Sequence, residues 1–439
     1  MSFTTDGKIR AEWDPLKKIV IHRPGFEMFL GLMEPYSSLY ERAFSRDGAR
    51  KEHEALEHVL VNEFKVEVFK LKDLILNAAD RRPVIRQKLI DLAIKCTEYG
   101  GDAPTIKRAQ EEFLKNISHL DTSHFFYMLL MNPLISFKTD SGARNIELNI
   151  TARQPVSNLY FMRDQQFVTD KGIVICRLAK PARRKEPVIT RFLFEEVLEL
   201  PIIKEIEAPG TIEGGEFIPF GKFALIGIGD RTNRSAIDQL LTIPFDYEEI
   251  GVVHQPMHPL VQSDKPDPMI NMHLDTYFNV ASDRVVVGNE LLLKNAMVEI
   301  YHNEGNGKFS KAANDMNLYD YIKHKGFEVI NITTLEQMAY ASNFLCIRNG
   351  HILAVEVERV VPEVLENLKI RARKEPARLG KLYAQAEKDY ENLRNEGQFF
   401  PHKKELYRAG IDAYPIILKN LTGGYGAAHC MTCSLTRGV

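Results

Sequence analysis

A turn followed by a short apolar strand recurs along the second part of the chain, and this repeat limits the fold more than any other feature. The strand segments lie at 171–175, 221–226, 283–287 and 349–354. Amphipathic helical segments, such as 233–241, lie between them. β-β-α-β units of roughly fifty residues or more would produce this spacing. Doubly wound α/β folds also alternate strands with helices, so the repeat alone leaves both arrangements open.

Two helical blocks interrupt the alternation. Between residues 78 and 149 no clear strand is recognised before residue 146, and the apolar stripe from Ile85 to Cys96 has helical spacing. We expect residues 78–149 to form an all-helical insertion in an α/β domain made of residues 1–77 and 150–439. The second block, 362–402, has one apolar face and one charged face. This pattern favours a solvated helix packed on the body over a helix that binds a partner.

The composition excludes several classes of protein. Of 439 residues, 44% are hydrophobic and 26% charged, which is typical of a globular chain. The net charge of -2 provides no field for nucleic acid or an anionic membrane. The longest apolar run, 125–131, is too short to span a bilayer, and residues 1–6 lack a signal pattern. Five scattered cysteines argue against a disulfide framework, so we expect a cytoplasmic protein.

Polar residues gather in four short segments beside the predicted strands. These are 158–164, 213–216, 273–276 and 429–430. Because sites are commonly built from strand ends and the loops that follow them, these segments are the candidates for a functional site.

Cys430 is the candidate nucleophile. It follows the loop Gly423-Gly424-Tyr425-Gly426, whose glycines let the backbone approach a ligand closely. A thiolate held by a nearby cation is nucleophilic, although a buried free cysteine is the commoner role for any single cysteine. With Cys433, His273 and Asp275 it could also form a zinc site. A single C-x-x-C pair is a weak metal signal, so we expect no metal.

The remaining polar residues suit a planar cation. His273 and Asp275 are two residues apart, and in a strand both would face one pocket. Glu213 lies in a glycine-containing turn, and Asp164 adds another carboxylate. Carboxylates pair bidentately with a guanidinium, whereas a thiol with carboxylates is a poor ligand set for a hard metal ion. A thiolate could then attack the guanidinium carbon and divide a difficult hydrolysis into two steps.

Several motifs, taken in order along the chain, resemble those of arginine deiminases, in the superfamily of guanidine-modifying enzymes. The matching segments are 20–25, 158–164, 181–184, 212–216, 227–232, 273–276 and 429–433. The resemblance covers nearly the whole chain. It implies a five-bladed pseudo-symmetric α/β propeller of ββαβ units, with a helical insertion and the site at its centre.

The resemblance also implies a reaction. L-Arginine and water would give L-citrulline and ammonia without a cofactor. Cys430 looks like the nucleophile that forms a covalent amidino-thioether, or thiouronium, intermediate. His273 looks like the general acid for ammonia and then the base for water. Asp164 and Asp275 would hold the guanidinium nitrogens, with Glu213 beside His273.

The α-carboxylate of the substrate would bind at the other end of the site. By the same resemblance its partners are Asn158, Arg183 or Arg184, and Arg231, since arginine binds a carboxylate with two parallel N–H bonds. Some family members carry a further arginine in the loop before the nucleophile, where this chain has Tyr425. Tyrosine donates one hydrogen bond there but brings no charge.

This difference motivates the alternatives. The chain could act on agmatine or methylarginine, transfer the amidino group to an amine, or bind arginine without turnover as a sensor. The expected partner is the small-molecule substrate, together with further copies of the chain in a dimer or tetramer. Because attack needs a thiolate and a protonated histidine together, we expect a bell-shaped pH–rate profile.

Overall fold

The computed structural model describes residues 7–139, 146–267, 270–305 and 307–438. Outside residues 98–152, five sheets share one pairing pattern, in which a central strand pairs antiparallel with one neighbour and parallel with the other. In the order antiparallel, central and parallel strand, the sheets are β21 (Cys433–Arg437), β1 (Leu16–Ile21) and β2 (Glu67–Lys70); β6 (Gln166–Val168), β7 (Ile173–Ile175) and β8 (Ile202–Glu205); β9 (Phe217–Pro219), β10 (Phe223–Ile228) and β11 (Glu249–His254); β12 (Phe278–Val280), β13 (Val285–Gly288) and β17 (Glu328–Asn331); and β18 (Leu345–Arg348), β19 (His351–Val355) and β20 (Asp412–Ile416).

The predicted turn–strand segments are confirmed as central strands. They correspond to β7, β10, β13 and β19. These strands are rich in Val and Ile because neighbouring strands flank them and their side chains are largely buried. The third sheet continues through β14 (Met297–Asn303), with β15 (Phe309–Lys311) and β16 (Met316–Asn317) paired to it.

Helices fill the connections between central and parallel strands, as a parallel pairing requires. They are α1 (Phe26–Met33) and α2 (Arg46–Asn62); α7 (Glu186–Phe192); α8 (Arg234–Leu240); α9 (Glu290–Leu293) and α10 (Leu318–His324); and α12 (Val357–Lys374), α13 (Pro376–Glu396) and α14 (Lys404–Arg408). A further helix, α11 (Thr334–Met338), lies next to α13. Each unit therefore has the order of a ββαβ repeat, and the fold is mixed α/β.

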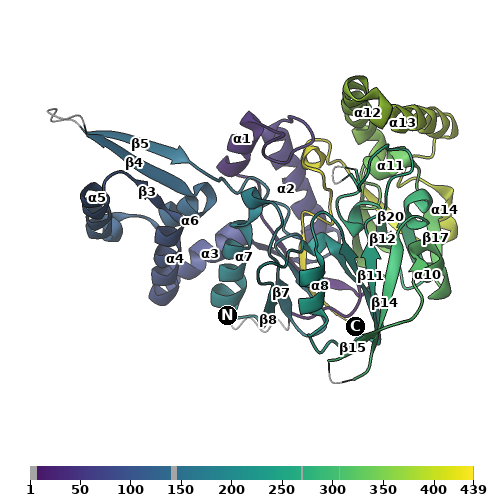
Figure 1. Cartoon of the computed structure of the whole chain (residues 1–439), viewed down its shortest axis with the longest axis horizontal. Helices are drawn as coiled ribbons and strands as arrows, with labels where there is room; N and C mark the ends of the chain where they lie inside the picture. The colour runs from purple at the N-terminus through teal and green to yellow at the C-terminus, as the bar shows by residue number, and fades with distance from the viewer. Residues whose placement is uncertain (1–6, 140–145, 268–269, 306, 439) are drawn as a thin grey trace.

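The expectation that residues 78–149 are all helical is wrong. The segment contains α3 (Leu71–Arg81), α4 (Pro83–Cys96), α5 (Ala103–Asn116) and α6 (Thr122–Met131), but also β3 (Glu98–Gly100), β4 (Pro133–Thr139) and β5 (Ile146–Ala152). Asn132 has a left-handed φ of 46° and Pro133 cannot continue a helix, so α6 ends and an antiparallel pair begins. In Figure 1, α5 and these strands extend from one side of the body.

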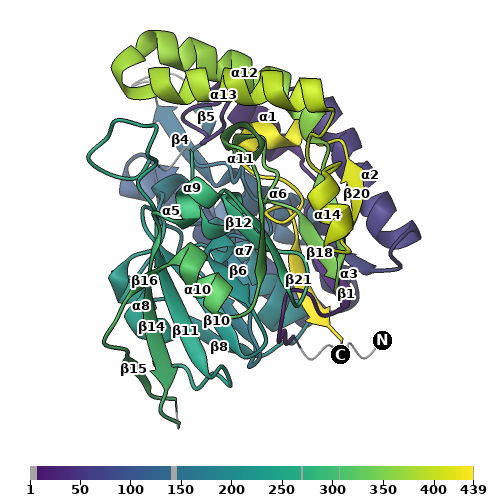
Figure 2. The same cartoon turned by 90° about the vertical axis from the view of Figure 1, so that its right-hand side faces the viewer.

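The second helical block begins earlier than expected. Helix α12 starts at Val357 and continues through Pro362, although proline removes a backbone hydrogen bond. Its buried face holds the turns on either side of the proline in the core through Val357, Val360, Val361 and Val364. The predicted apolar face near its end is confirmed, since Leu379, Leu382, Ala386 and Leu393 of α13 are buried. Figure 2 shows α12 and α13 lying across one end of the molecule.

Distant parts of the chain meet in the sheet of β1. Strand β21 pairs antiparallel with β1, with Cys433 opposite Val20. This pairing carries the preceding loop, which contains Cys430, into the interior. Across the described part of the chain, none of the helices combines the length and the apolar character that crossing a bilayer requires.

Candidate active site

The loop before β21 positions Cys430 in the interior. The side chain is 3% exposed, and the Asn343 amide donates a hydrogen bond to its sulfur over 3.1 Å. The amide oxygen of Asn343 accepts from the backbone N–H groups of Ala427 (2.7 Å) and Cys430 (3.2 Å). A Cβ on Gly426 would lie 2.8 Å from the Cβ of Cys430, so the close approach requires glycine there. Asn343 and Gly426 together fix the direction of the sulfur.

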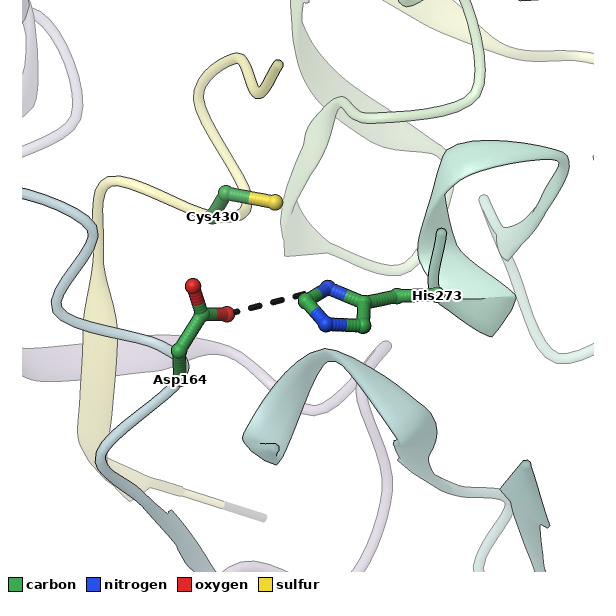
Figure 3. Close-up of side chains that lie close together, drawn as sticks. All are labelled: Asp164, His273 and Cys430. Carbon is green, nitrogen blue, oxygen red and sulfur yellow. Dashed lines mark ion pairs between the residues drawn. The ribbon is translucent and has the colours of Figure 1, made fainter. Parts of the chain in front are cut away.

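An imidazole and a carboxylate face this sulfur. Asp164, His273 and Cys430 are buried, and their reactive atoms all lie within 4.8 Å of one another. The Nδ1 atom of His273 is 3.8 Å from Asp164 Oδ1, the contact dashed in Figure 3. In that view Cys430 and Asp164 both point toward the imidazole. The sequence therefore predicted three residues that the fold brings together from distant segments.

The expectation that His273 and Asp275 lie on one strand is wrong. Asp275 belongs to a 3-10 turn, η5 (Leu274–Thr276), and His273 is the residue that caps its start. The Thr276 hydroxyl donates to the His273 carbonyl over 2.6 Å. The turn still directs both side chains inward. His273 forms a hydrogen bond with Glu213. Asp275 accepts hydrogen bonds from the Cys430 thiol, over 3.5 Å, and from the imidazole of His429.

The imidazole of His273 is held in its charged form. Its Nε2 donates to Glu213 Oε2 over 2.8 Å. Burial lowers the pKa of His273, but the hydrogen bond to Glu213 and the charges of Asp164 and Glu213 raise that pKa to about 9. Burial disfavours the charge on Glu213 in turn, yet Arg231 and His273 lower the pKa of this carboxyl strongly. An imidazolium–carboxylate pair therefore persists at neutral pH.

The thiol of Cys430, by contrast, is held in its neutral form. Burial and the negative charges of Asp275 and Asp164 raise its pKa well above the ordinary value. Burial and these two acids therefore disfavour the thiolate in the protein alone, although the charged ring of His273 lies within 4.8 Å of the sulfur. A cation between the sulfur and these acids would favour the thiolate.

Arg183 is the one of the two neighbouring arginines that reaches the site. Its guanidinium donates to Asp164 Oδ2 over 2.7 Å and to Glu186 over 2.8 Å, and all three residues are buried. Arg184 is exposed and donates to the backbone carbonyls of residues 178 and 179. The fold thus brings Arg183 to the site and leaves Arg184 at the surface.

A small cavity of about 20 Å³ lies at the centre of these groups. Seven of the predicted site residues line it: Asn158, Asp164, Arg183, Arg231, His273, Tyr425 and Cys430. Glu213 and Asp275 do not line it but contact His273 and Cys430 from behind. The amide of Asn158 donates to the Ser38 carbonyl over 2.7 Å, and Tyr425 has a left-handed φ of 73°.

Sequence reasoning missed three supporting residues. Asn343 holds the nucleophile loop, and His429 donates through Nδ1 to Asp275 over 2.7 Å. Glu12 accepts from His429 over 2.9 Å and pairs with Arg437 over 2.6 Å. His429 could have been noticed from its place beside Cys430, whereas no local pattern marks the other two.

The zinc set considered from sequence is not formed. Within the described ranges, the potential metal-binding cluster is Asp164, His273 and Cys430, and Cys433 packs in the core instead. Thiolate, imidazole and carboxylate are all zinc ligands. Here, however, Arg183 already occupies the carboxylate of Asp164, so the charge around this cluster disfavours a metal cation.

Comparisons with known proteins agree with the site. The arginine deiminase family profile matches residues 37–437. An arginine deiminase of Halobacterium salinarum is 26% identical, with 99% of this chain and 97% of the relative aligned. One from Treponema denticola is also 26% identical, over 84% of this chain and 93% of the relative. The crystal structure of AgrE with ornithine and NAD+ superposes with a TM-score of 0.50 at 12% identity, over 96% of this chain and 39% of that one, which supports the fold. Because the family profile spans nearly the whole sequence, this chain belongs to the arginine deiminase family.

Proposed function

We propose that this protein is an arginine deiminase, a hydrolase that cleaves an amidine C–N bond of L-arginine to give L-citrulline and ammonia. The observation that carries the proposal is the convergence of the Cys430 sulfur, the His273 imidazole and the Asp164 carboxylate within 4.8 Å at one buried cavity. A thiol, a charged imidazole and carboxylates form a site for a carbon that is both cationic and electrophilic.

Binding of the guanidinium prepares the nucleophile. We assign its nitrogens to Asp164 and Asp275, so the substrate takes over the contact that Arg183 makes with Asp164. The positive charge then lies beside the sulfur and lowers the pKa of the Cys430 thiol, which releases its proton to solvent. The substrate itself thereby adds a second positive charge beside the sulfur, next to that of His273.

The chemical steps follow from this arrangement. The sulfur forms a bond to the guanidinium carbon, and the His273 imidazolium gives its proton to the departing nitrogen, which leaves as ammonia. The product is a thiouronium on Cys430. His273, now neutral, removes a proton from water as the oxygen bonds to the same carbon. The C–S bond then breaks, the proton left on the oxygen passes to the departing sulfur, and citrulline leaves with the Cys430 thiol restored. Glu213 keeps the imidazole oriented and charged in the resting protein.

We assign the α-carboxylate end to Asn158, Arg231 and Tyr425, and add one residue from α12. Arg371 and Tyr425 line a second cavity of about 20 Å³, which shares Met272 and Tyr425 with the catalytic cavity. Within the described chain, no ion pair is formed by the guanidinium of Arg371. A free cation at this end favours a substrate that keeps its carboxylate, and it offsets the uncharged Tyr425.

Architecture and assembly complete the proposal. The repeated antiparallel–central–parallel pairing supports a five-bladed pseudo-symmetric propeller around the site. We infer that residues 78–149 are an insertion in the catalytic domain of residues 1–77 and 150–439, and that 362–402 belong to a second insert over the site.

The free cysteines favour a cytoplasmic location. We also propose that the protein forms a homo-oligomer.

Citrulline formation tests the function. Purified protein with L-arginine should release citrulline, detected colorimetrically, and ammonia in equal amounts. Cys430→Ala should abolish this activity, whereas Cys433→Ala, three residues away and also buried, should retain it. Citrulline release that survives Cys430→Ala would show that the assigned nucleophile is wrong.

A second substrate is favoured by one observation, the uncharged Tyr425 at the carboxylate end. Agmatine is arginine without the carboxylate. Turnover of agmatine and arginine should therefore be compared at equal concentration, and a clear preference for agmatine would replace the proposed substrate.

A further inference from the structure

A second, larger cavity lies apart from the catalytic one. It has a volume of about 490 Å³ and is formed by the turn after β1 and by residues of α1, α2, α3 and α6. It shares no lining residue with the catalytic cavity. Basic side chains dominate its polar wall: Arg23, Arg46, Arg50, Lys70 and Lys72. The proposed reaction uses none of these residues.

Two helices begin at this cavity. Its wall includes the first turn of α1, at Phe26 and Glu27, and the first turn of α3, at Leu71, Lys72 and Asp73. Neither helix has a side-chain hydrogen bond at its N-cap. The first N–H groups of a helix have no partner within the helix and carry partial positive charge. The start of α3 therefore adds donors for an anion to the cationic wall, whereas at α1 the Glu27 carboxylate already accepts the Gly25 N–H over 2.7 Å.

A buried polar group on the same wall lacks a partner. His22 lines the cavity and is 2% exposed. Its Nε2 donates to Glu27 Oε1 over 3.0 Å, while its Nδ1 makes no hydrogen bond. This ring nitrogen is a buried polar atom whose hydrogen-bonding capacity a ligand in the cavity could satisfy.

The cations around this wall reinforce one another. Behind it, His53 is fully buried, and its pKa is lowered to about 3 by burial and by the charges of His22, Arg23 and Arg50. The pKa of Arg23 is also lowered, first by burial and then by the charge of Arg50. These lowered pKa values show that positive charges lie close together, which indicates a positive potential at this wall.

Acidic residues compensate only part of this charge. Arg23 pairs with Glu54, Arg46 with Asp47, and Lys70 with Glu57 and Asp73. For Arg50 and Lys72, no ion pair occurs among the residues that the structure describes. Arg50 donates to the Pro24 carbonyl, and Lys72 to the Tyr127 hydroxyl over 2.7 Å. These neutral partners leave two cations whose charge an anion could neutralise.

We infer that this cavity binds a small molecule that carries phosphate. Phosphate oxygens accept several N–H donors at once and pair with arginine and lysine. A volume of about 490 Å³ is within the range of small-molecule sites. Phe26 and Tyr127 are 50% and 40% exposed on the same wall and offer ring surfaces for a base. The structure thus favours a nucleoside phosphate over phosphate alone.

The site has a physical connection to the catalytic cavity. The segment between α1 and α2 carries Leu39, which lines the catalytic cavity. In the same segment the Tyr40 hydroxyl donates to the Ser157 carbonyl over 2.7 Å, next to Asn158. An anion that contacts Arg50 of α2 and the residues beside α1 would therefore touch both helices that flank this segment.

Calorimetric titration of the full chain tests the inference without using the reaction, so it stands or falls separately from the deiminase function. The probes are ATP, inorganic phosphate and adenosine, each at an ionic strength matched with chloride. ATP should bind saturably, phosphate more weakly and adenosine most weakly. Arg50→Gln and Lys72→Gln should each weaken ATP binding about tenfold, the typical effect of one charge-assisted hydrogen bond.

Lys51→Gln is the matched control, because Lys51 is an exposed neighbour on α2 outside the cavity wall and should leave ATP binding unchanged. Thermal melts of all variants confirm that they fold. The inference is overturned if ATP and phosphate give no saturable heat, if Lys51→Gln weakens binding as much as Arg50→Gln, or if adenosine binds as tightly as ATP.

Discussion

Replacing Glu213 by glutamine should change the proton affinity of His273 and thereby the pH range of activity. The variant keeps the size of the side chain and an oxygen that can accept from Nε2, but it removes the negative charge. In the protein the pKa of His273 is about 9, against an ordinary value of 6.5. The hydrogen bond and charge of Glu213 both contribute to this rise, while Asp164 and Glu216 contribute the rest.

The size of the effect follows from these values. At about pH 7.5 a pKa of about 9 keeps about 97% of the rings protonated, whereas a pKa of 6.5 would keep about 9%. Because Asp164 and Glu216 remain in Glu213→Gln, we expect the pKa of His273 to fall by about one unit or more without reaching 6.5. The alkaline limb of the pH–rate profile should move to lower pH by the same amount, since His273 must be protonated when ammonia leaves.

The same shift has a consequence for stability. The folded protein binds the His273 proton more tightly than the unfolded chain does. The resulting stabilisation is complete below pH 6.5 and is lost as the pH rises through about 9. Unfolding of Glu213→Gln in denaturant should therefore show a weaker loss of stability between these two pH values than the parent protein shows.

NMR titration of ¹³C-labelled histidine, with the signal assigned through His273→Gln, measures this pKa directly. Glu216→Gln is the control in the same loop, because Glu216 contributes least of the named charges and its own pKa is raised to about 7 by burial. A His273 signal that still titrates near pH 9 in correctly folded Glu213→Gln would refute the reasoning.

Three further predictions concern the sulfur and the carboxylate end. Asn343→Ala should lower kcat about tenfold or more while arginine KM changes little, because the lost hydrogen bond orients the nucleophile; an unchanged kcat would remove this role. Gly426→Ala should abolish citrulline formation in a folded protein, as seen by circular dichroism, since the added Cβ would lie 3.2 Å from the Cys430 sulfur; full activity would contradict this. Arg371→Ala should raise KM for arginine about tenfold but leave agmatine unaffected, whereas Arg373→Ala, exposed on the same helix, should change neither; equal effects on both substrates would exclude a carboxylate contact.

The sequence was most informative where a short pattern determines structure. The central strands are runs of Val and Ile between turns, such as the segment 283–287, and burial by neighbouring strands accounts for that composition. The sequence was misleading where an apolar run is compatible with both a helix and a strand. The run that follows Asn132 looks like the end of an apolar helix, yet a left-handed residue and a proline turn it into strand β4.

The candidate site shows the same contrast. Residues in polar motifs, such as Asp164 and Cys430, could be predicted because polar residues in loops next to buried strands commonly belong to functional sites. Asn343 and Glu12 could not, because their roles depend on contacts with residues far away in sequence. Arg371 is one of many cations on a charged helix face, and only the fold distinguishes it from Arg373.

The pairing of β1 with β21 means that catalysis reports on the completeness of folding. The sulfur lies just before β21, which pairs with β1 from the other end of the chain, and the imidazole and the acids come from segments between them. Because closing so long a loop costs entropy, we expect this pairing to form late in folding. A partly folded molecule can hold the acids or the thiol, but not both in register. Regain of turnover after dilution from denaturant would therefore time the final closure of the molecule, and misassembled copies would be inert toward arginine rather than weakly active.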